Sequence, residues 1–210
     1  GQFVDSVDHV KAVELFKLLA DNGISDGQFK MGLYYETGDG GIVADSMKAV
    51  EYYQLAADQG HGMAMCYLAD FYRIGQFLPL DKQKAFDYYM KAHEAGSETG
   101  TYYVARSYLE GCGVEIDSVA AIPYLRQAAA QDVGNAAYYM AEFYNYGYAS
   151  VEPNADSAIA YYLKAHENGN ADASYYIGIQ LLKEDMYEAA VSYLAQAVRA
   201  NHPKAIVKYA

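Results

Sequence analysis

Two histidine–glutamate pairs are the residues best suited to metal binding or acid–base chemistry. They are His93-Glu94 and His166-Glu167. Both histidines occupy the same position in segments that repeat along the chain, but the segments lie two repeats apart. Packed helices are about 8–10 Å apart, whereas a zinc–ligand bond is about 2 Å long. We therefore predict that each histidine replaces an alanine in a helix and that neither binds a metal.

The cysteines and a glycine-rich run offer no further chemistry. Cys66 and Cys112 are the only cysteines, and they do not fall at matched positions, so we predict free thiols. The run Gly38-Asp39-Gly40-Gly41 follows an expected helix and lacks the Lys-Ser/Thr of a phosphate loop. Asp39 also lacks the alternating ligands of a calcium loop. We therefore predict no catalytic residue, no cofactor and no metal.

The net charge of the chain excludes some classes of binding partner. Fifteen Lys and Arg stand against 27 Asp and Glu among 210 residues, a formal net charge of −12. That charge argues against sequence-independent binding to nucleic acid and against docking on an anionic membrane. No apolar run approaches the roughly 20 residues that span a bilayer. The hydrophobic fraction of 53% predicts an ordered chain with a core, and 24 tyrosines without tryptophan are its unusual feature.

Two sets of landmarks repeat every 36 or 37 residues over most of the chain. In the first set, a small residue precedes a larger one by three positions: Gly32/Tyr35, Ala69/Tyr72, Ala105/Tyr108, Ala141/Tyr144 and Gly178/Leu181. The second set is Ala12, Ala49, Ala85, Ala121, Ala158 and Ala190. Eleven residues after these stand helix-stop residues: Gly23, Gly60, Gly96, Asp132, Gly169 and Asn201.

Each repeat is predicted to fold as helix A, a glycine-bearing loop, helix B and a short turn. Residues that can cap the start of helix B lie four positions before the second landmark: Asp8, Asp45, Asp81, Asp117 and Asn154. The fifth repeat connects its helices by Leu181–Met186 without the glycine loop. Pro123 falls inside the third helix B and is expected to kink that helix or delay its start.

These landmarks predict an all-α chain that forms one solenoid over residues 1–210. We expect an unpaired helix B at 8–23 and a partial helix A at 202–210. The repeats between them are expected at about 24–60, 61–96, 97–132, 133–169 and 170–201. Because a solenoid normally carries polar capping helices, and because the chain begins with Gly1, we expect an excerpt of a longer array.

The repeated pattern resembles the Sel1-like repeat, a relative of the tetratricopeptide repeat with a longer loop. The runs MGLYYETGDGGIVADSMKAVEYYQLAADQG (31–60) and LADFYRIGQFLPLDKQKAFDYYMKAHEAG (68–96) carry it, and VARSYLEGCGV (104–114) adds the Gly-x-Gly-Val loop. One departure is Tyr-Tyr at 52–53, 88–89 and 161–162, where the family often has Trp-Tyr. The resemblance implies a right-handed superhelix of helix pairs and a bacterial interaction scaffold, and it carries over no catalytic residue.

In the related tetratricopeptide repeat, helix A lines the concave side, and this implies where a peptide or protein segment would bind. The available face lies beside the core stripe, where side chains vary from repeat to repeat. Tyrosine suits such a groove because it offers a large area and a polar tip at low entropic cost. We predict partner-binding residues at Asp70, Arg73, Tyr102, Arg106, Tyr138, Glu142, Asn145 and Tyr175.

Alternatives remain open at this stage. The tyrosines of this face could equally pack against neighbouring helices, and its charged residues could pair on a solvated surface. A carbohydrate-binding or hydrolytic module could use the tyrosine-lined groove, although a glycosidase needs an aimed carboxylate pair. End-to-end self-association through the terminal helices is a third interpretation. The compartment stays open between bacterial cytoplasm, periplasm and secretion.

Overall fold

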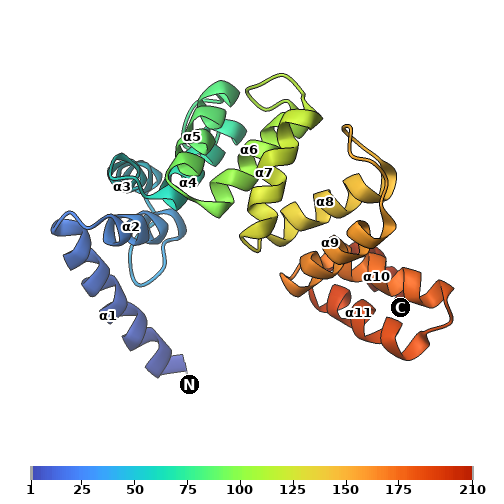
Figure 1. Ribbon diagram of the computed structural model, residues 1–210. Coiled ribbons are helices and arrows are strands. Elements are labelled where there is room, and N and C mark those ends of the chain that lie inside the picture. Colours follow the sequence, from blue (N-terminus) through green and yellow to red (C-terminus); the bar gives the residue numbers. More distant parts are fainter. Residues whose placement is uncertain (1, 210) are drawn as a thin grey trace. The chain divides into compact units, whose positions relative to one another are not determined.

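The computed structural model describes the backbone of residues 2–209 and the side chains of residues 11–207. This part of the chain forms twelve helices and no strand, which confirms the predicted all-α fold of paired helices (Figure 1). The helices are α1 (Gln2–Asp21), α2 (Ser25–Thr37), α3 (Ser46–Asp58), α4 (Gly62–Ile74), α5 (Lys82–Glu94), α6 (Glu98–Glu110), α7 (Ser118–Ala130), α8 (Gly134–Tyr146), α9 (Ala155–Glu167), α10 (Ala171–Lys183), α11 (Tyr187–Arg199) and α12 (Pro203–Tyr209).

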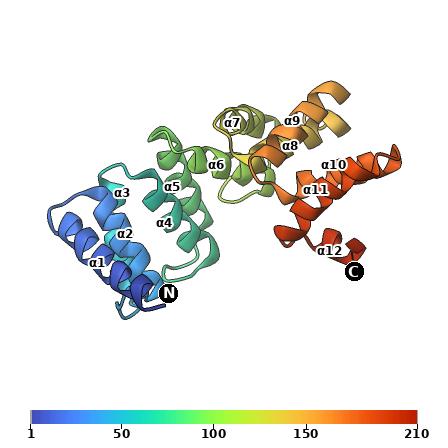
Figure 2. The same cartoon turned by 90° about the horizontal axis from the view of Figure 1, so that it is seen from below.

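The helices divide between two compact units, residues 1–116 and 117–210. The first unit holds α1 to α6, coloured blue to green, and the second holds α7 to α12, coloured yellow to red (Figure 1). Within each unit, helices that follow one another along the chain pack side by side, as α1 and α2 or α8 and α9 do (Figure 2). The even-numbered helices α2 to α10 are the predicted A helices, and the odd-numbered helices are the B helices.

Four of the five predicted N-caps of the B helices are confirmed. The side chains of Asp45, Asp81, Asp117 and Asn154 each accept hydrogen bonds from backbone N–H groups in the first turn. Such a cap stabilises a helix by about 1 kcal/mol. The fifth, Asp8, has its side chain outside the described residues. Its helix α1 begins at Gln2, before the predicted start at residue 8.

The predicted helix stops also occur where expected. All six residues in the list that begins with Gly23 and ends with Asn201 have positive φ, including the two that are not glycine, Asp132 (63°) and Asn201 (57°). The A helices α2, α4, α6 and α8 end on the left-handed caps Gly38, Gly75, Gly111 and Gly147. A residue in the left-handed conformation therefore follows the end of both helices of a repeat.

Small residues and tyrosine together build the core of each unit. Ala69, Ala105 and Ala141 are fully buried at the predicted small positions of the A helices. On the B helices, the inner tyrosines Tyr53 and Tyr89 are at most 1% exposed, as is Tyr162 in the second unit. Because the small side chains let helix backbones approach, the large rings fill the space between neighbouring helices.

Pro123 does not delay the start of its helix. Helix α7 begins at Ser118, directly after the cap residue Asp117, and continues through Pro123. A proline leaves the carbonyl four residues earlier without its N–H partner. That carbonyl belongs to Val119, which is 55% exposed, so water can reach this side of the helix.

Candidate functional site

The eight predicted partner-binding residues lie on A helices and divide evenly between the two units. Asp70 and Arg73 lie on α4, Tyr102 and Arg106 on α6, Tyr138, Glu142 and Asn145 on α8, and Tyr175 on α10. Seven of the eight are half-buried, whereas Tyr102 is buried with 9% exposure. Each unit therefore presents its own partly accessible row of polar and aromatic side chains, and Tyr102 contributes mostly to packing.

In the first unit, Asp70 and Arg73 form a hydrogen-bonded cluster with a core tyrosine. The Arg73 guanidinium donates to Asp70 Oδ1 at 2.6 Å, and the hydroxyl of Tyr89 donates to the same oxygen at 2.8 Å. Burial and then the Asp70 carboxylate raise the pKa of Tyr89, so its hydroxyl stays protonated and serves as a donor. The carboxylate of Asp70 is consequently held in one position on the surface of α4.

Arg106 lies one repeat further along the same unit and pairs within its own helix. Its Nε donates to Glu110 Oε1 at 2.6 Å, and about a third of its side chain is exposed. The ring of Tyr103, next to Tyr102, stacks on Tyr89 with 4.8 Å between centroids. Neither the Asp70–Arg73 pair nor the Arg106–Glu110 pair joins two helices.

In the second unit, Glu142 accepts a short hydrogen bond from the hydroxyl of Tyr162. Burial and the nearby Glu142 carboxylate raise the pKa of Tyr138, whose ring meets Tyr162 edge to face at 5.9 Å. Asn145 accepts a longer hydrogen bond, 3.4 Å, from Tyr176. The structure thus brings together Tyr138 and Glu142 around one core tyrosine.

Tyr175 on α10 packs against His202 rather than against a core tyrosine. Its ring stacks on the imidazole of His202 at 4.5 Å between centroids, and His202 Nε2 contacts Asp172 Oδ1 at 3.0 Å. His202 also caps α12, because its Nδ1 accepts from the N–H of Ala205. Tyr175 therefore packs on the start of the last helix while part of its ring stays accessible.

A tyrosine–carboxylate pair recurs between helix B and helix A of the same repeat. Tyr53 donates to Glu36 at 2.5 Å, as Tyr89 does to Asp70 and Tyr162 to Glu142. The other two repeats have a buried leucine at the tyrosine position and no carboxylate at the helix A positions: Leu125 with Arg106 and Leu109, and Leu194 with Ile179 and Leu182. A buried phenol needs an acceptor, so the two positions change together.

A second set of tyrosines on the A helices was missed in the sequence. Tyr67, Tyr103 and Tyr176 stack on the inner tyrosine of the preceding repeat, with centroid separations of 5.0, 4.8 and 4.0 Å. All three lie two positions before the small landmark residue, a regularity that the sequence displays. The rings join consecutive repeats within each unit.

The two histidines of the His-Glu pairs have structural contacts. His93 Nδ1 lies 2.9 Å from Thr101 Oγ1, and His166 Nδ1 lies 2.8 Å from Ser174 Oγ. Each contact joins helix B to the next helix A within one unit. Burial lowers the pKa of His166. Over the described residues, no group of three or more His, Cys, Asp or Glu side chains is placed to hold a metal ion.

The two thiols are free and buried. Cys66 is 2% exposed, and burial raises its pKa to about 12. Cys112 lies in the loop after α6 with 7% exposure, and burial raises the pKa of this thiol as well. A protonated, covered thiol is a poor nucleophile, so neither cysteine has the environment of a catalytic residue.

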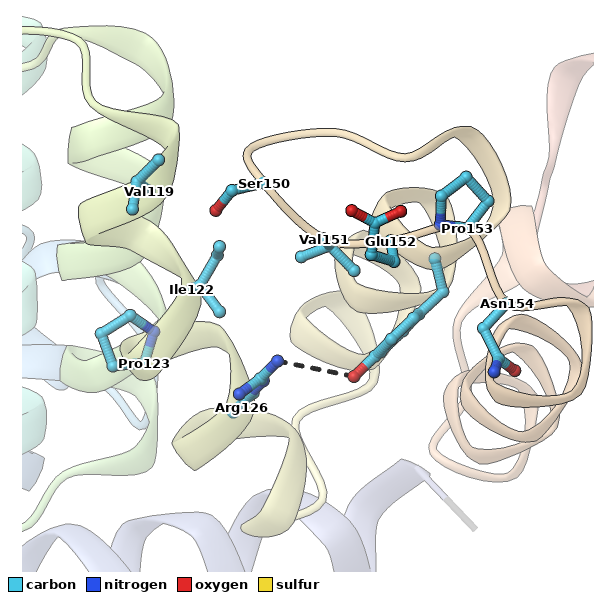
Figure 3. A pocket seen from close by; sticks show the side chains of 10 residues that line it. Val119, Ile122, Pro123, Arg126, Ser150, Val151, Glu152, Pro153 and Asn154 are labelled. Atoms are coloured by element: carbon cyan, nitrogen blue, oxygen red, sulfur yellow. Dashed lines mark hydrogen bonds between the residues drawn. The ribbon is translucent and has the colours of Figure 1, made fainter.

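A sizeable cavity in the second unit was not anticipated from the sequence. It measures about 480 Å³ and lies between α7 and the loop that follows α8 (Figure 3). Val119 and Ile122 face it from α7, and Ser150 and Val151 face it from the loop. At one end, an Arg126 Nη donates to the hydroxyl of Tyr144 at 3.5 Å. The cavity combines an aliphatic wall with one cation, Arg126, and one carboxylate, Glu152.

Nearly the whole chain matches the model of one repeat family. The family model described as Sel1 repeat matches residues 1–24, 25–61, 62–97, 100–133, 134–170 and 171–202. No curated protein matches the chain. Among the described residues, none of the helices combines the length and the apolar character needed to cross a membrane.

Solved bacterial structures share the fold. A protective antigen present in uropathogenic Escherichia coli strains is 28% identical with a TM-score of 0.74, covering 95% of this chain and 43% of the antigen. The chain thus spans less than half the length of that relative. A Sel1 repeat protein from Oxalobacter formigenes is 26% identical with a TM-score of 0.79, covering 90% of this chain and 76% of that protein. An immunity protein from Pseudomonas aeruginosa, 23% identical with a TM-score of 0.62, covers 86% and 66% and shows the fold alone.

Proposed function

Since the chain belongs to the Sel1 repeat family, we propose that it is a non-catalytic scaffold whose A helices bind a peptide or protein segment. Sel1 repeats and the related tetratricopeptide repeats typically bind proteins or peptides, and the family is in general not enzymatic. The residues of interest are the polar ones on the accessible side of α4 and α6 in the first unit and of α8 and α10 in the second.

One observation carries this proposal: the polar side chains on these helices are held in place yet remain partly accessible. Asp70 and Glu142 are fixed by hydroxyl donors that are themselves buried in the core. Side chains that are already ordered lose little conformational entropy when a partner binds. Each carboxylate also has lone pairs left for a further donor.

The charge of the chain indicates the kind of partner. With a net charge of −12, the molecule attracts basic segments and repels acidic ones over long range. On the second unit, Glu142 has a hydroxyl donor and no cationic partner within ion-pair distance among the described residues. We therefore expect a segment with Lys or Arg to bind there, because a cation can pair with Glu142.

A displayed library of random peptides, selected against the whole chain, tests the proposal. Arg106→Ala and Asn145→Ala change one accessible polar residue in each unit without opening the core. For a peptide that binds the corresponding unit, each variant should weaken binding by about tenfold, the upper end for a well-placed polar contact. Affinity is measured by fluorescence anisotropy, and thermal unfolding is measured by circular dichroism.

The matched control is Arg199→Ala, an exposed arginine on the B helix α11. It should leave affinity unchanged. Selected peptides that bind both A-helix variants as tightly as the unmodified chain would refute binding on this surface. A variant that loses affinity and stability together would show instead that the residue belongs to the packing.

A further inference from the structure

In the first and third repeats, the loop packs on the helix B that precedes it. In the first repeat, a side chain at Gly40 would overlap Val13 of α1. In the third repeat, a Cβ at Gly113 would overlap the carbonyl oxygen of Lys82 and lie 2.9 Å from Cβ of Phe86, both on α5. Gly113 also has a φ of 76°, so both space and backbone require glycine there. Both loops contact the residue of helix B that stands one position after the landmark alanine. We call this position the loop seat.

The fourth repeat brings its loop to the same side of the preceding helix B in the second unit, with the cavity of about 480 Å³ between them. Its loop places Ser150 and Val151 across from Ile122, which occupies the position of Val13 and Phe86 (Figure 3). Val151 is only 7% exposed, so the loop buries an aliphatic side chain near this seat. A short segment with an aliphatic side chain thus accompanies the loop seat in this unit.

The fifth repeat lacks the loop and leaves its seat uncovered. Helices α10 and α11 are joined directly through residues 184–186. On α9, Ile159 occupies the loop-seat position and is 57% exposed, and Leu163 one turn later is 36% exposed. These side chains line a groove of about 160 Å³ with Ile177 and Leu181 of α10. The stacked rings of Tyr162 and Tyr176 also line it.

The rim of the groove is acidic at one end. Glu184 lines it beside Gln180, and Asp185 follows in the connection to α11. Glu184 forms no ion pair among the described residues and is exposed. A cation beside the apolar segment would find a partner in Glu184, whereas a carboxylate there would be repelled.

We propose that this groove, formed by Ile159, Leu163, Ile177 and Leu181, is a docking site for a partner's extended segment that carries aliphatic side chains and a neighbouring Lys or Arg. The partner segment would lie where the missing loop lies in the other repeats. The site is separate from the polar side chains of the proposed A-helix surface in the first unit, and it can be present whether or not that surface binds a peptide.

The probe is a synthetic peptide based on the chain's own third loop, Gly-Val-Gly-Val-Lys-Ile with blocked ends. It follows residues 111–116 with Val in place of Cys112 and Lys in place of Glu115. Binding is followed by methyl NMR of the whole chain. We expect saturable shifts confined to the methyl groups of the four groove residues. Shifts spread over both units, or none at millimolar peptide, would overturn the proposal.

Two variants make the test specific. Ile159→Asp should weaken peptide binding by about tenfold, since the aliphatic contact with the peptide is lost and a carboxylate takes its place. Ile159 is exposed, so this variant should still fold. Met47→Asp is the matched control, because Met47 is 74% exposed on the B helix α3. Equal affinity of both variants and the unmodified chain would contradict docking in the groove.

A loop graft and a charge reversal complete the experiment. Replacing residues 184–186 by the segment 111–117 should cover Ile159, abolish peptide binding and raise the melting temperature. Changing the peptide Lys to Asp should weaken binding about threefold or more, a typical effect of one exposed charge pair. Arg106→Ala should have no effect on this peptide, which separates the groove from the first unit's part of the proposed A-helix surface. A graft that still binds the peptide would contradict the proposal.

Discussion

The hydroxyl of Tyr89 provides a direct test of the tyrosine–carboxylate pair. Tyr89→Phe keeps the buried ring and its stacking on Tyr103 at 4.8 Å. It removes the donor that lies 2.8 Å from Asp70 Oδ1 and the oxygen that Arg73 Nε reaches at 3.2 Å. The substitution therefore isolates the hydrogen bonds of one hydroxyl from the hydrophobic contribution of the ring.

The size of the effect follows from what remains after the hydroxyl is lost. A hydrogen bond to a charged group contributes about 1.5–3 kcal/mol. Asp70 keeps Arg73 at 2.6 Å, and its side chain is 31% exposed, so water replaces part of the lost interaction. We therefore expect Tyr89→Phe to lower the free energy of unfolding by about 1–2 kcal/mol. For a chain of 210 residues this corresponds to a decrease in melting temperature of roughly 2–8 °C.

Urea unfolding followed by circular dichroism at the helix band measures this change, because the chain has no tryptophan to report it. The control is Tyr34→Phe on α2, a half-buried tyrosine whose hydroxyl forms no hydrogen bond within the described residues. It should change stability by less than about 0.5 kcal/mol. A double-mutant cycle with Asp70→Asn should show coupling of about 1 kcal/mol between the two groups. Additive effects, or equal losses in both Phe variants, would refute the pairing.

Three further predictions follow from the same contacts. Leu194→Tyr should destabilise the fifth repeat by about 1–3 kcal/mol in urea unfolding, because the new hydroxyl meets Ile179 where the other repeats offer an acceptor. Adding Ile179→Glu should restore part of this loss. If it does not, the volume of the ring sets the cost. Burial raises the pKa of Tyr53 and Tyr162 above 10. As pH rises, the unfolded chain therefore loses these phenol protons at a lower pH than the folded chain does. Stability should therefore be complete below pH 10 and fall as pH rises above it, and a flat urea midpoint between pH 9 and pH 11 would contradict this. Cys66 should react with a thiol reagent only at the rate of unfolding, while Cys112 should react faster through local opening of its loop. Single Cys→Ser variants distinguish the two thiols, and equal rates would disprove this opening.

The helices and their ends could be predicted from the sequence because they depend on local interactions. The caps at Asp45, Asp81 and Asp117 bond to N–H groups two or three residues away. The helix stops require only a residue that tolerates positive φ. The small landmark residues repeat because every repeat meets the same neighbour, so their burial also follows from spacing. The predicted start of α1 at residue 8 is too late, because Asp8 occupies the cap position of the other B helices although the helix already begins at Gln2.

The surface was harder to predict, because the accessible or buried state of a ring depends on the neighbouring repeat. Tyr102 and Tyr138 occupy the same position in successive repeats, yet the first is buried and the second half-buried. The sequence pattern could not distinguish these environments. Nor could it reveal that Tyr162 bonds to Glu142, since that pair joins residues 20 positions apart on two packed helices.

By itself, the sequence determined the family, the order of helix pairs and the absence of the fifth loop, since repetition and short-range bonding are written in residue spacing. Only the tertiary structure decided which tyrosines are core, which carboxylates they hold and which apolar side chains remain uncovered. Exposure is a property of what lies against a side chain. In this chain the contacting groups come from another helix, 17 residues away for Tyr53 with Glu36 and 34 residues away for Tyr88 with Gln54.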